Sequence, residues 1–197
     1  MDYMILVNQS HPLPEDWEKS LQTVTVVNSV GDEVVVEKKT YDAYLLLKKS
    51  LEEKDGICLE PDSGLRSIAE QQEIMERFTE KYGAEYARKT VAPPGCSEHH
   101  TGLAVDLYYR MKNADGSVRD VYTNEELEEH PDIWAVIHGR LAEFGFILRY
   151  PEGKTHITGY QYEPWHIRYL DSAAAAADIM GRPGLTLEEW LAEKGSK

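Results

Sequence analysis

The chain has 197 residues, of which 42% are hydrophobic and 28% charged, and it carries a formal net charge of −14. This length and composition are typical of one globular domain, so residues 1–197 are expected to form a single domain. The excess of acidic side chains argues against nucleic acid as a partner, because binding to phosphates requires a basic patch. Anionic membrane surfaces would repel the same negative charge.

The cysteines and the lengths of the apolar runs limit the remaining classes of protein. Cys58 and Cys96 are the two cysteines, and without a CxxC spacing they exclude a thiolate zinc knuckle and do not indicate a disulfide framework. Two free thiols are expected, with a single bridge between them as the alternative. The N-terminus lacks the pattern of a signal peptide, and no run approaches the roughly 20 apolar residues of a membrane span. A soluble cytoplasmic protein is therefore expected, although a chain trimmed of its leader, and thus extracytoplasmic, would look the same.

The first part of the chain predicts a hairpin followed by a helix. β-Branched runs at 24–26 and 34–36 flank turn residues, which favours two paired strands. From Thr40 apolar residues recur at helical spacing, and Gly56 ends the helix. A short buried strand at 57–59 and a turn at 61–64 are expected next.

The best-marked helix begins after Ser67. Ser67 and Glu70 form a capping box, in which each side chain satisfies a free backbone N–H. A stripe that should face the core follows at helical spacing, made of Ile68, Gln71, Met75, Phe78 and Tyr82. Gly83 ends this helix, and a second short helix is expected at 84–89.

The second half of the chain mixes helices and strands. A hairpin tip is expected at 113–116, a second capping box at 123–126, and a last helix capped at Thr186. Helices are predicted at 132–144 and 173–180, and strands at 146–150 and 163–169, with a loop at 151–159. The order lacks a regular βαβ rhythm, which favours a small α+β domain with an antiparallel sheet.

Residues 97–106 concentrate groups that bind metals. His99 and Asp106 lie seven positions apart, and Gly102 between them would let a loop histidine face a strand carboxylate. Asp106 stands among apolar residues, where a carboxylate is costly unless it binds a metal or another cation. A catalytic zinc takes three protein ligands, and His166 is the candidate for the third. Glu163, three residues before His166, could act as the base.

Spacing alone leaves other interpretations open. A strand histidine is more often a hydrogen-bonded core residue, and an aspartate is often a cap or half of an ion pair. His100 is a rival to His99, and surface positions are the default for the other histidines, namely His11, His100, His130, His138 and His156. Cys96 with a nearby histidine base is a formal alternative, but no helix N-terminus follows it to lower the thiol pKa.

Two segments resemble a known family. Its SxHxxGxAxD signature is matched by Ser97, His99, Gly102, Ala104 and Asp106, and its ExxH element by Glu163-Pro164-Trp165-His166. Both elements resemble the VanY, VanXY and VanX group of D-Ala-D-Ala metallopeptidases, and similarity extends over roughly residues 5–170. The resemblance implies a mononuclear zinc enzyme of the LAS type, with a small central antiparallel sheet flanked by helices.

The resemblance also implies roles for single residues. His99, Asp106 and His166 would bind one Zn²⁺, with His99 chosen over His100, and Glu163 would be the base. Gly64-Leu65-Arg66 matches the family's GYR segment with Leu65 in place of tyrosine, so Arg66 would polarise the scissile carbonyl and stabilise the oxyanion. Gln71, Ser97 and Ser63 would also lie at the substrate, and Trp165 would pack beside the site. A backbone-bonded Gln71 and a loop-shaping Ser97 are the alternatives.

The implied substrates are peptidoglycan stem peptides or precursors that end in D-Ala-D-Ala. Removing such ends would link the chain to glycopeptide (vancomycin) resistance or to cell-wall remodelling. Dual-function members carry an aspartate where this chain has Ser63, which favours a D,D-carboxypeptidase that trims longer peptides. D,D-Dipeptidase and L,D-carboxypeptidase activities remain open, and a cell-wall-binding module without turnover is the alternative outside the enzymes.

Overall fold

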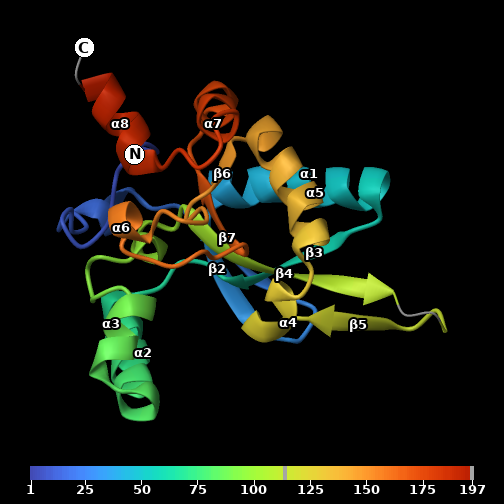
Figure 1. The fold of residues 1–197 in the computed structure, drawn as a ribbon, viewed down its shortest axis with the longest axis horizontal. Coiled ribbons are helices and arrows are strands. Elements are labelled where there is room, and N and C mark those ends of the chain that lie inside the picture. Colours follow the sequence, from blue (N-terminus) through green and yellow to red (C-terminus); the bar gives the residue numbers. More distant parts are fainter. Residues whose placement is uncertain (113–114, 196–197) are drawn as a thin grey trace.

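A five-stranded antiparallel sheet crosses the middle of the molecule (Figure 1). The computed structural model describes residues 1–112 and 115–195. The strands of this sheet are β3 (Cys58–Ser63), β4 (Ala104–Lys112), β5 (Val118–Val121), β6 (Phe146–Leu148) and β7 (His166–Tyr169). Their order is β3-β4-β7-β6, with β5 also paired to β4. The predicted α+β class with a central antiparallel sheet is confirmed.

Strand β4 connects the parts of the sheet that matter for function. Its first residues pair with β7 and its later residues with β5, while β3 runs along its other edge. In this register Asp106 lies opposite His166 on β7 and opposite Ser63 on β3. Because directly opposite residues of antiparallel strands lie about 5 Å apart at their Cβ atoms, three strands bring side chains together at Asp106.

Two helices cover the sheet and form the main core with it. They are α1 (Lys38–Asp55) and α5 (Pro131–Leu141). Helix α5 continues through η3 (Ala142–Phe144) into β6. The buried side chains of this core include Leu47, Leu51, Leu59, Leu107, Trp134 and Ile137. A smaller core forms where α7 (Ala173–Met180) and α8 (Leu187–Gly195) pack on Ile147. Among the described residues, no helix is long and apolar enough to cross a membrane.

Helices α2 (Ile68–Tyr82) and α3 (Ala84–Thr90) project away from the sheet (Figure 1). The predicted capping box of Ser67 and Glu70 is present. The predicted core-facing stripe is wrong, because Gln71 is the one buried residue of α2, and Ile68 and Tyr82 are 46% and 47% exposed. The stripe instead borders a cavity, to which Gln71, Phe78 and Tyr82 contribute walls.

Other boundaries also differ from the predictions. The turn expected at 61–64 is wrong, because β3 continues to Ser63 through a β-bulge that accommodates Asp62. The strand expected at 146–150 ends at Leu148. The loop at 151–159 contains a short helix. The remaining elements are η1 (Trp17–Ser20), β1 (Thr23–Val27), β2 (Glu33–Glu37), η2 (Glu98–Thr101), α4 (Asn124–Glu128) and α6 (Thr155–Thr158). The hairpin of β1 and β2 is as predicted, and the tip expected at 113–116 lies partly outside the described residues.

Gly64 is packed against the backbone of β2, which makes it a sensitive position for stability. A Cβ atom there would lie 2.1 Å from the Val35 carbonyl oxygen and 2.9 Å from Cγ2 of Val36. We expect Gly64→Ala to lower the free energy of unfolding by about 1–3 kcal/mol, measured by urea denaturation. Gly139→Ala is the control, because nothing lies within 4 Å of its Cβ position in α5. That change should be neutral or stabilise the helix by up to about 1 kcal/mol, and equal effects of the two changes would contradict this account.

Candidate metal and peptide site

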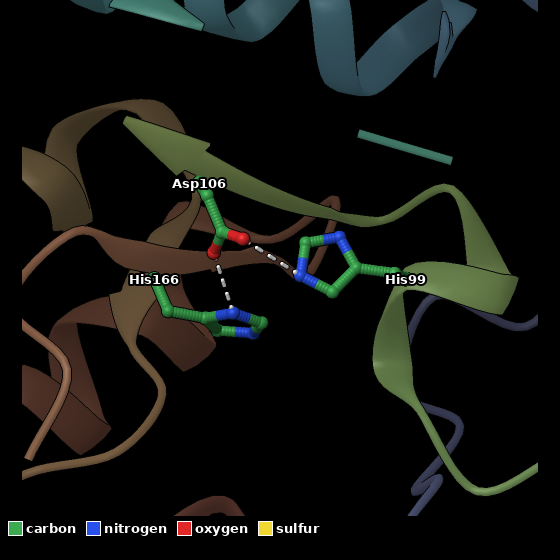
Figure 2. Close-up of side chains that lie close together, drawn as sticks. All are labelled: His99, Asp106 and His166. Atoms are coloured by element: carbon green, nitrogen blue, oxygen red, sulfur yellow. Dashed lines mark hydrogen bonds and ion pairs between the residues drawn. The ribbon is translucent and has the colours of Figure 1, made fainter. Parts of the chain in front are cut away.

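Three side chains from separate elements meet at the predicted metal site (Figure 2). Nε2 of His99, on η2, lies 3.1 Å from Oδ2 of Asp106, on β4. Nδ1 of His166, at the start of β7, lies 2.8 Å from Oδ1 of Asp106. One potential donor atom of each residue lies within 4.8 Å of the others. Two imidazoles and a carboxylate are a donor set of catalytic zinc, whose ligand atoms lie roughly 3–4 Å apart, so the cluster fits such an ion.

Local backbone structure places His99 over the strand. The Ser97 side chain accepts a hydrogen bond from the backbone N–H of His99 and caps η2. Gly102 then ends η2 in the left-handed conformation, with φ of 71°, and the chain enters β4. This turn does what the sequence pattern predicted, since it brings the imidazole of His99 to face the carboxylate of Asp106.

Each histidine of the cluster has a second polar group behind its ring. Nδ1 of His99 lies 2.7 Å from the Gly64 carbonyl oxygen and donates to it, which leaves the Nε2 lone pair directed at the cluster. His166 has the opposite arrangement, with Nδ1 in the cluster and Nε2 3.7 Å from Oε2 of Glu98. The ring orientations are therefore those that a metal ligand needs.

The electrostatics of the cluster favour a cation. Burial alone would lower the pKa of His166, but Asp106 and Glu98 raise it to about 9. Burial opposes the charge of Asp106 too, yet the two imidazoles hold its pKa well below the usual range. Burial lowers the pKa of His99, with help from Arg66 and His166 and against the effect of Asp106. Asp106 therefore offers an ionised carboxylate, and His99 a neutral imidazole, as donors to a cation.

Glu163 and Arg66 flank the cluster. Oε2 of Glu163 lies 3.8 Å from Nδ1 of His166, and burial raises the Glu163 pKa to about 7 against the opposing effects of His166 and Arg66. Nη2 of Arg66 lies 3.9 Å from Oδ2 of Asp106. The guanidinium is held in place, because it donates to Oε1 of Gln71 and to Oγ of Ser63, both at 2.9 Å. A carboxyl group and a fixed cation therefore stand on the same side of the sheet as the three potential ligands.

A cavity of about 620 Å³ opens onto these residues. Its walls include the three potential ligands and five more of the predicted site residues, namely Arg66, Gln71, Ser97, Glu163 and Trp165. Ser63 instead lies against Arg66, and the bulged Asp62 beside it borders the cavity. Burial, with help from Asp106 and Asp32, raises the pKa of Asp62 to about 6.

The same cavity extends away from the cluster between helices. One wall carries a row of aromatic rings, Phe78, Tyr82 and Tyr86, whose neighbouring centroids are 5.5 and 5.1 Å apart. The facing groups come from α4 and the segment before β7, and include Glu125, Glu128 and Tyr162. The lining of the cavity thus extends from the potential metal ligands to residues of α2, α3 and α4.

The structure tests the surface positions predicted for the other histidines and the free thiols predicted for the cysteines. The surface position expected for His100 is wrong, because it is buried, with Nδ1 2.7 Å from the Arg66 carbonyl and Nε2 accepting from the Gly95 N–H at 3.0 Å. His138 is half-buried, and its Nε2 lies 2.9 Å from the Pro164 carbonyl oxygen. Cys58 and Cys96 are both free thiols, and burial raises the pKa of Cys96, which disfavours a thiolate nucleophile.

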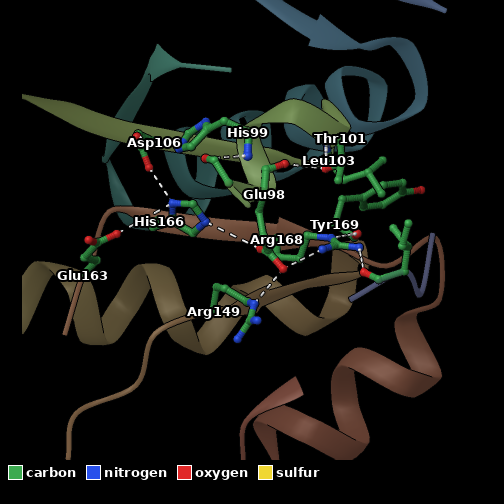
Figure 3. Close-up of polar contacts among 12 residues, drawn as sticks. Glu98, His99, Thr101, Leu103, Asp106, Arg149, Glu163, His166, Arg168 and Tyr169 are labelled. Atoms are coloured by element: carbon green, nitrogen blue, oxygen red, sulfur yellow. Dashed lines mark hydrogen bonds and ion pairs between the residues drawn. The ribbon is translucent and has the colours of Figure 1, made fainter. Parts of the chain in front are cut away.

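Glu98 is a site residue that sequence reasoning missed. It is fully buried behind His166, and although burial opposes its charge, Arg149 and Arg168 hold its pKa well below the usual range (Figure 3). The sequence did place two arginines in apolar segments that were predicted as strands, since Arg149 follows Leu148 and Arg168 follows Ile167. Buried cations require anionic partners, but the sequence did not single out Glu98 among the acidic residues of the chain.

Comparison with known proteins agrees with this geometry. The family model described as VanY, D-alanyl-D-alanine carboxypeptidase, matches residues 33–172. A D-alanyl-D-alanine carboxypeptidase of Enterococcus faecalis is 34% identical over 197 residues, which cover 95% of this chain and 65% of that protein. The bifunctional D-Ala-D-Ala dipeptidase and carboxypeptidase VanXYC of Enterococcus gallinarum is 30% identical over 190 residues, covering 96% of this chain and 94% of that protein.

Solved structures give the same grouping. A mutant of the vancomycin-resistance D,D-pentapeptidase VanY from a VanB-type cassette, in complex with Zn(II), superposes with a TM-score of 0.73 at 31% identity, covering 96% of this chain and 98% of that one. VanYB in complex with D-alanine-D-alanine has the same TM-score, 0.73, at 33% identity, covering 96% and 97% of the two chains. The match to the family model and these relatives show that the chain belongs to the VanY family of D-alanyl-D-alanine carboxypeptidases.

Proposed function

We propose that this chain is a zinc-dependent D,D-carboxypeptidase that removes the C-terminal D-Ala from peptidoglycan precursor peptides ending in D-Ala-D-Ala. The observation that carries the proposal is the meeting of His99, Asp106 and His166 beside Glu163 and Arg66 at the wall of one cavity. The zinc complex of the related VanY structure supports the choice of metal, and the D-alanine-D-alanine complex of VanYB supports the choice of substrate.

The three ligands would be Nε2 of His99, a carboxylate oxygen of Asp106 and Nδ1 of His166. Zinc held there would supply a Lewis acid that polarises the scissile carbonyl and lowers the pKa of the attacking water. Glu163 takes a proton from that water as its oxygen attacks the carbonyl carbon, and returns a proton to the leaving amine of D-Ala as the C–N bond breaks. A carboxyl group whose pKa is close to neutrality is suited to both transfers.

Arg66 stabilises the negative charge that develops on the carbonyl oxygen. Its hydrogen bonds to Gln71 and Ser63 fix the guanidinium before substrate arrives, and Gln71 is itself anchored because its Nε2 donates to the Ala92 carbonyl at 2.8 Å. Preorganised donors of this kind lower the barrier because they need no reorientation during the reaction.

The volume and lining of the cavity favour peptides longer than a free dipeptide. A volume of about 620 Å³ is in the range that encloses a ligand of drug size. The aromatic row of Phe78, Tyr82 and Tyr86 would contact residues that precede the two D-Ala units. Ser63 stands where dual-function members carry aspartate, which favours carboxypeptidase over dipeptidase action, and Asp62 one residue earlier borders the cavity. Loss of D-Ala-D-Ala ends would reduce the targets of vancomycin, which connects the proposal to resistance or wall remodelling.

The direct test compares D-Ala release from a stem pentapeptide with cleavage of free D-Ala-D-Ala, each with and without a chelator. The proposal expects metal-dependent release from the pentapeptide and a lower kcat/KM for the dipeptide. Faster cleavage of the dipeptide would favour a D,D-dipeptidase, and release of D-Ala from a stem tetrapeptide alone would favour an L,D-carboxypeptidase. Stoichiometric zinc binding without hydrolysis of any of these peptides would favour a binding module.

Tyr82 offers a test of peptide length. We expect Tyr82→Ala to lower kcat/KM for the pentapeptide by about 2- to 10-fold, the value of one aromatic contact. N-Acetyl-D-Ala-D-Ala ends close to the scissile bond, and its kinetics should not change. Tyr122→Ala is the matched control, because Tyr122 is 54% exposed and lies outside the cavity walls. Equal losses on both substrates would contradict a contact with the distal part of the peptide.

A further inference from the structure

Glu98 and His166 leave two buried polar atoms facing each other. The Glu98 side chain is fully buried and its Oε1 accepts from Nε of Arg149 at 2.8 Å and from Nη1 of Arg168 at 2.7 Å. Its second oxygen, Oε2, has no hydrogen-bond partner among the described residues, and neither has Nε2 of His166. These two atoms are 3.7 Å apart (Figure 3). A shift of less than about 1 Å would make a hydrogen bond of ordinary length.

We propose that Glu98 is a positioning residue for the metal centre. Its Oε2 accepts a hydrogen bond from the Nε2–H of His166 and so fixes the ring with Nδ1 directed at Asp106 and the metal. Metal-bound histidines generally donate their other N–H to such a group, which sets the tautomer and orients the ring. The inference rests on the proposed role of His166 as a zinc ligand.

The arrangement of charges separates this role from that of a simple ion pair. Glu98 and Glu188 supply two negative charges, and Arg149 and Arg168 supply two positive charges. Both arginines donate to Oε1 of Glu98, so their hydrogen bonds to this carboxylate do not use Oε2. The remaining oxygen is directed at the imidazole, as a positioning role requires.

Both terminal segments hold Glu98 in place. Nη2 of Arg168 donates to the carbonyl oxygens of Tyr3 and Ile5, at 3.0 and 2.8 Å. Nη1 and Nη2 of Arg149 donate to the two carboxylate oxygens of Glu188 on α8, at 2.8 and 2.7 Å. Tyr3, Ile5 and Glu188 all lie outside residues 33–172, the part matched by the family model. The ends of the chain are therefore connected to a proposed zinc ligand through one carboxylate.

The test is the zinc affinity of a Glu98→Gln protein, measured by competition with a chromophoric chelator. The amide keeps the shape but loses the anionic acceptor, so we expect the Kd for zinc to rise about 10- to 100-fold. The visible spectrum of the Co²⁺-substituted protein should also change, because the orientation of one ligand is less restrained. Glu189→Gln is the matched control, since Glu189 neighbours Glu188 but binds Lys154 near the surface, and its Kd should equal that of the wild type.

A second variant guards against misfolding. Glu98→Gln leaves two buried guanidiniums short of one anion, which can unfold a protein. The double variant Glu98→Gln with Arg168→Met removes one charge of each sign and keeps the Arg149–Glu188 pair. It should show the same rise in Kd while retaining a cooperative thermal transition. A folded variant with a wild-type Kd and an unchanged Co²⁺ spectrum would overturn the inference alone, whereas a wild-type protein that binds no zinc would overturn the proposed function as well.

Discussion

A Glu163→Gln protein should bind one Zn²⁺ with the affinity of the wild type and release D-Ala about 10²- to 10⁴-fold more slowly. The amide has the shape of the carboxylate but cannot take the proton of the attacking water. Glu163 lies 3.8 Å from His166, beyond hydrogen-bonding distance, and it is not one of the three potential ligands. The change should therefore remove proton transfer and leave the metal site intact.

The measurement combines steady-state D-Ala release from a stem pentapeptide with metal analysis of the same preparation. The loss should appear in kcat, with KM for the pentapeptide little changed, because Glu163 acts on the attacking water rather than on the bound peptide. Glu152→Gln is the control, because it removes the same charge from an exposed position in the 151–159 loop. Undiminished turnover of Glu163→Gln would assign the base to another group.

Local sequence signals predicted the helices and strands because their causes are local. The capping box of Ser67 and Glu70 acts within one turn of helix, and it marked the start of α2 correctly. The resemblance in the segments around His99 and His166 indicated that their side chains come together, and in the structure the pairing of β4 with β7 places Asp106 opposite His166. The helix boundaries required no knowledge of how distant surfaces pack, whereas the meeting of Asp106 and His166 was implied only by the resemblance.

Predictions failed where burial depends on distant partners. The periodicity of α2 indicated a core-facing stripe, yet α2 faces a cavity, and amphipathic spacing does not distinguish the two. His100 was expected at the surface, but carbonyl and amide groups of Arg66 and Gly95 accommodate it inside. Glu98 is stabilised by Arg149 and Arg168, which are 51 and 70 positions away, so nothing in its own neighbourhood revealed its burial.

The adjacent histidines allow a sharp test of the metal site. His99→Ala should lose stoichiometric zinc and all measurable D-Ala release, because a site of three protein ligands retains two. His100→Gln should keep its zinc, since the His100 ring bonds to the Arg66 carbonyl and the Gly95 N–H rather than to the cluster. An amide can replace one donor and one acceptor, which makes glutamine the appropriate substitution.

Metal content and D-Ala release are measured on both variants and on wild-type protein treated with a chelator, with thermal melts to establish folding. Chelated wild type should match His99→Ala, and added Zn²⁺ should restore the wild type while leaving the variant inactive. His100→Gln can lose some activity, because His100 supports the backbone of Arg66, but its zinc content should remain one per chain. If His100→Gln lost its zinc and a folded His99→Ala kept it, the ligand would be His100, and the turn at Gly102 would not serve the role assigned to it here.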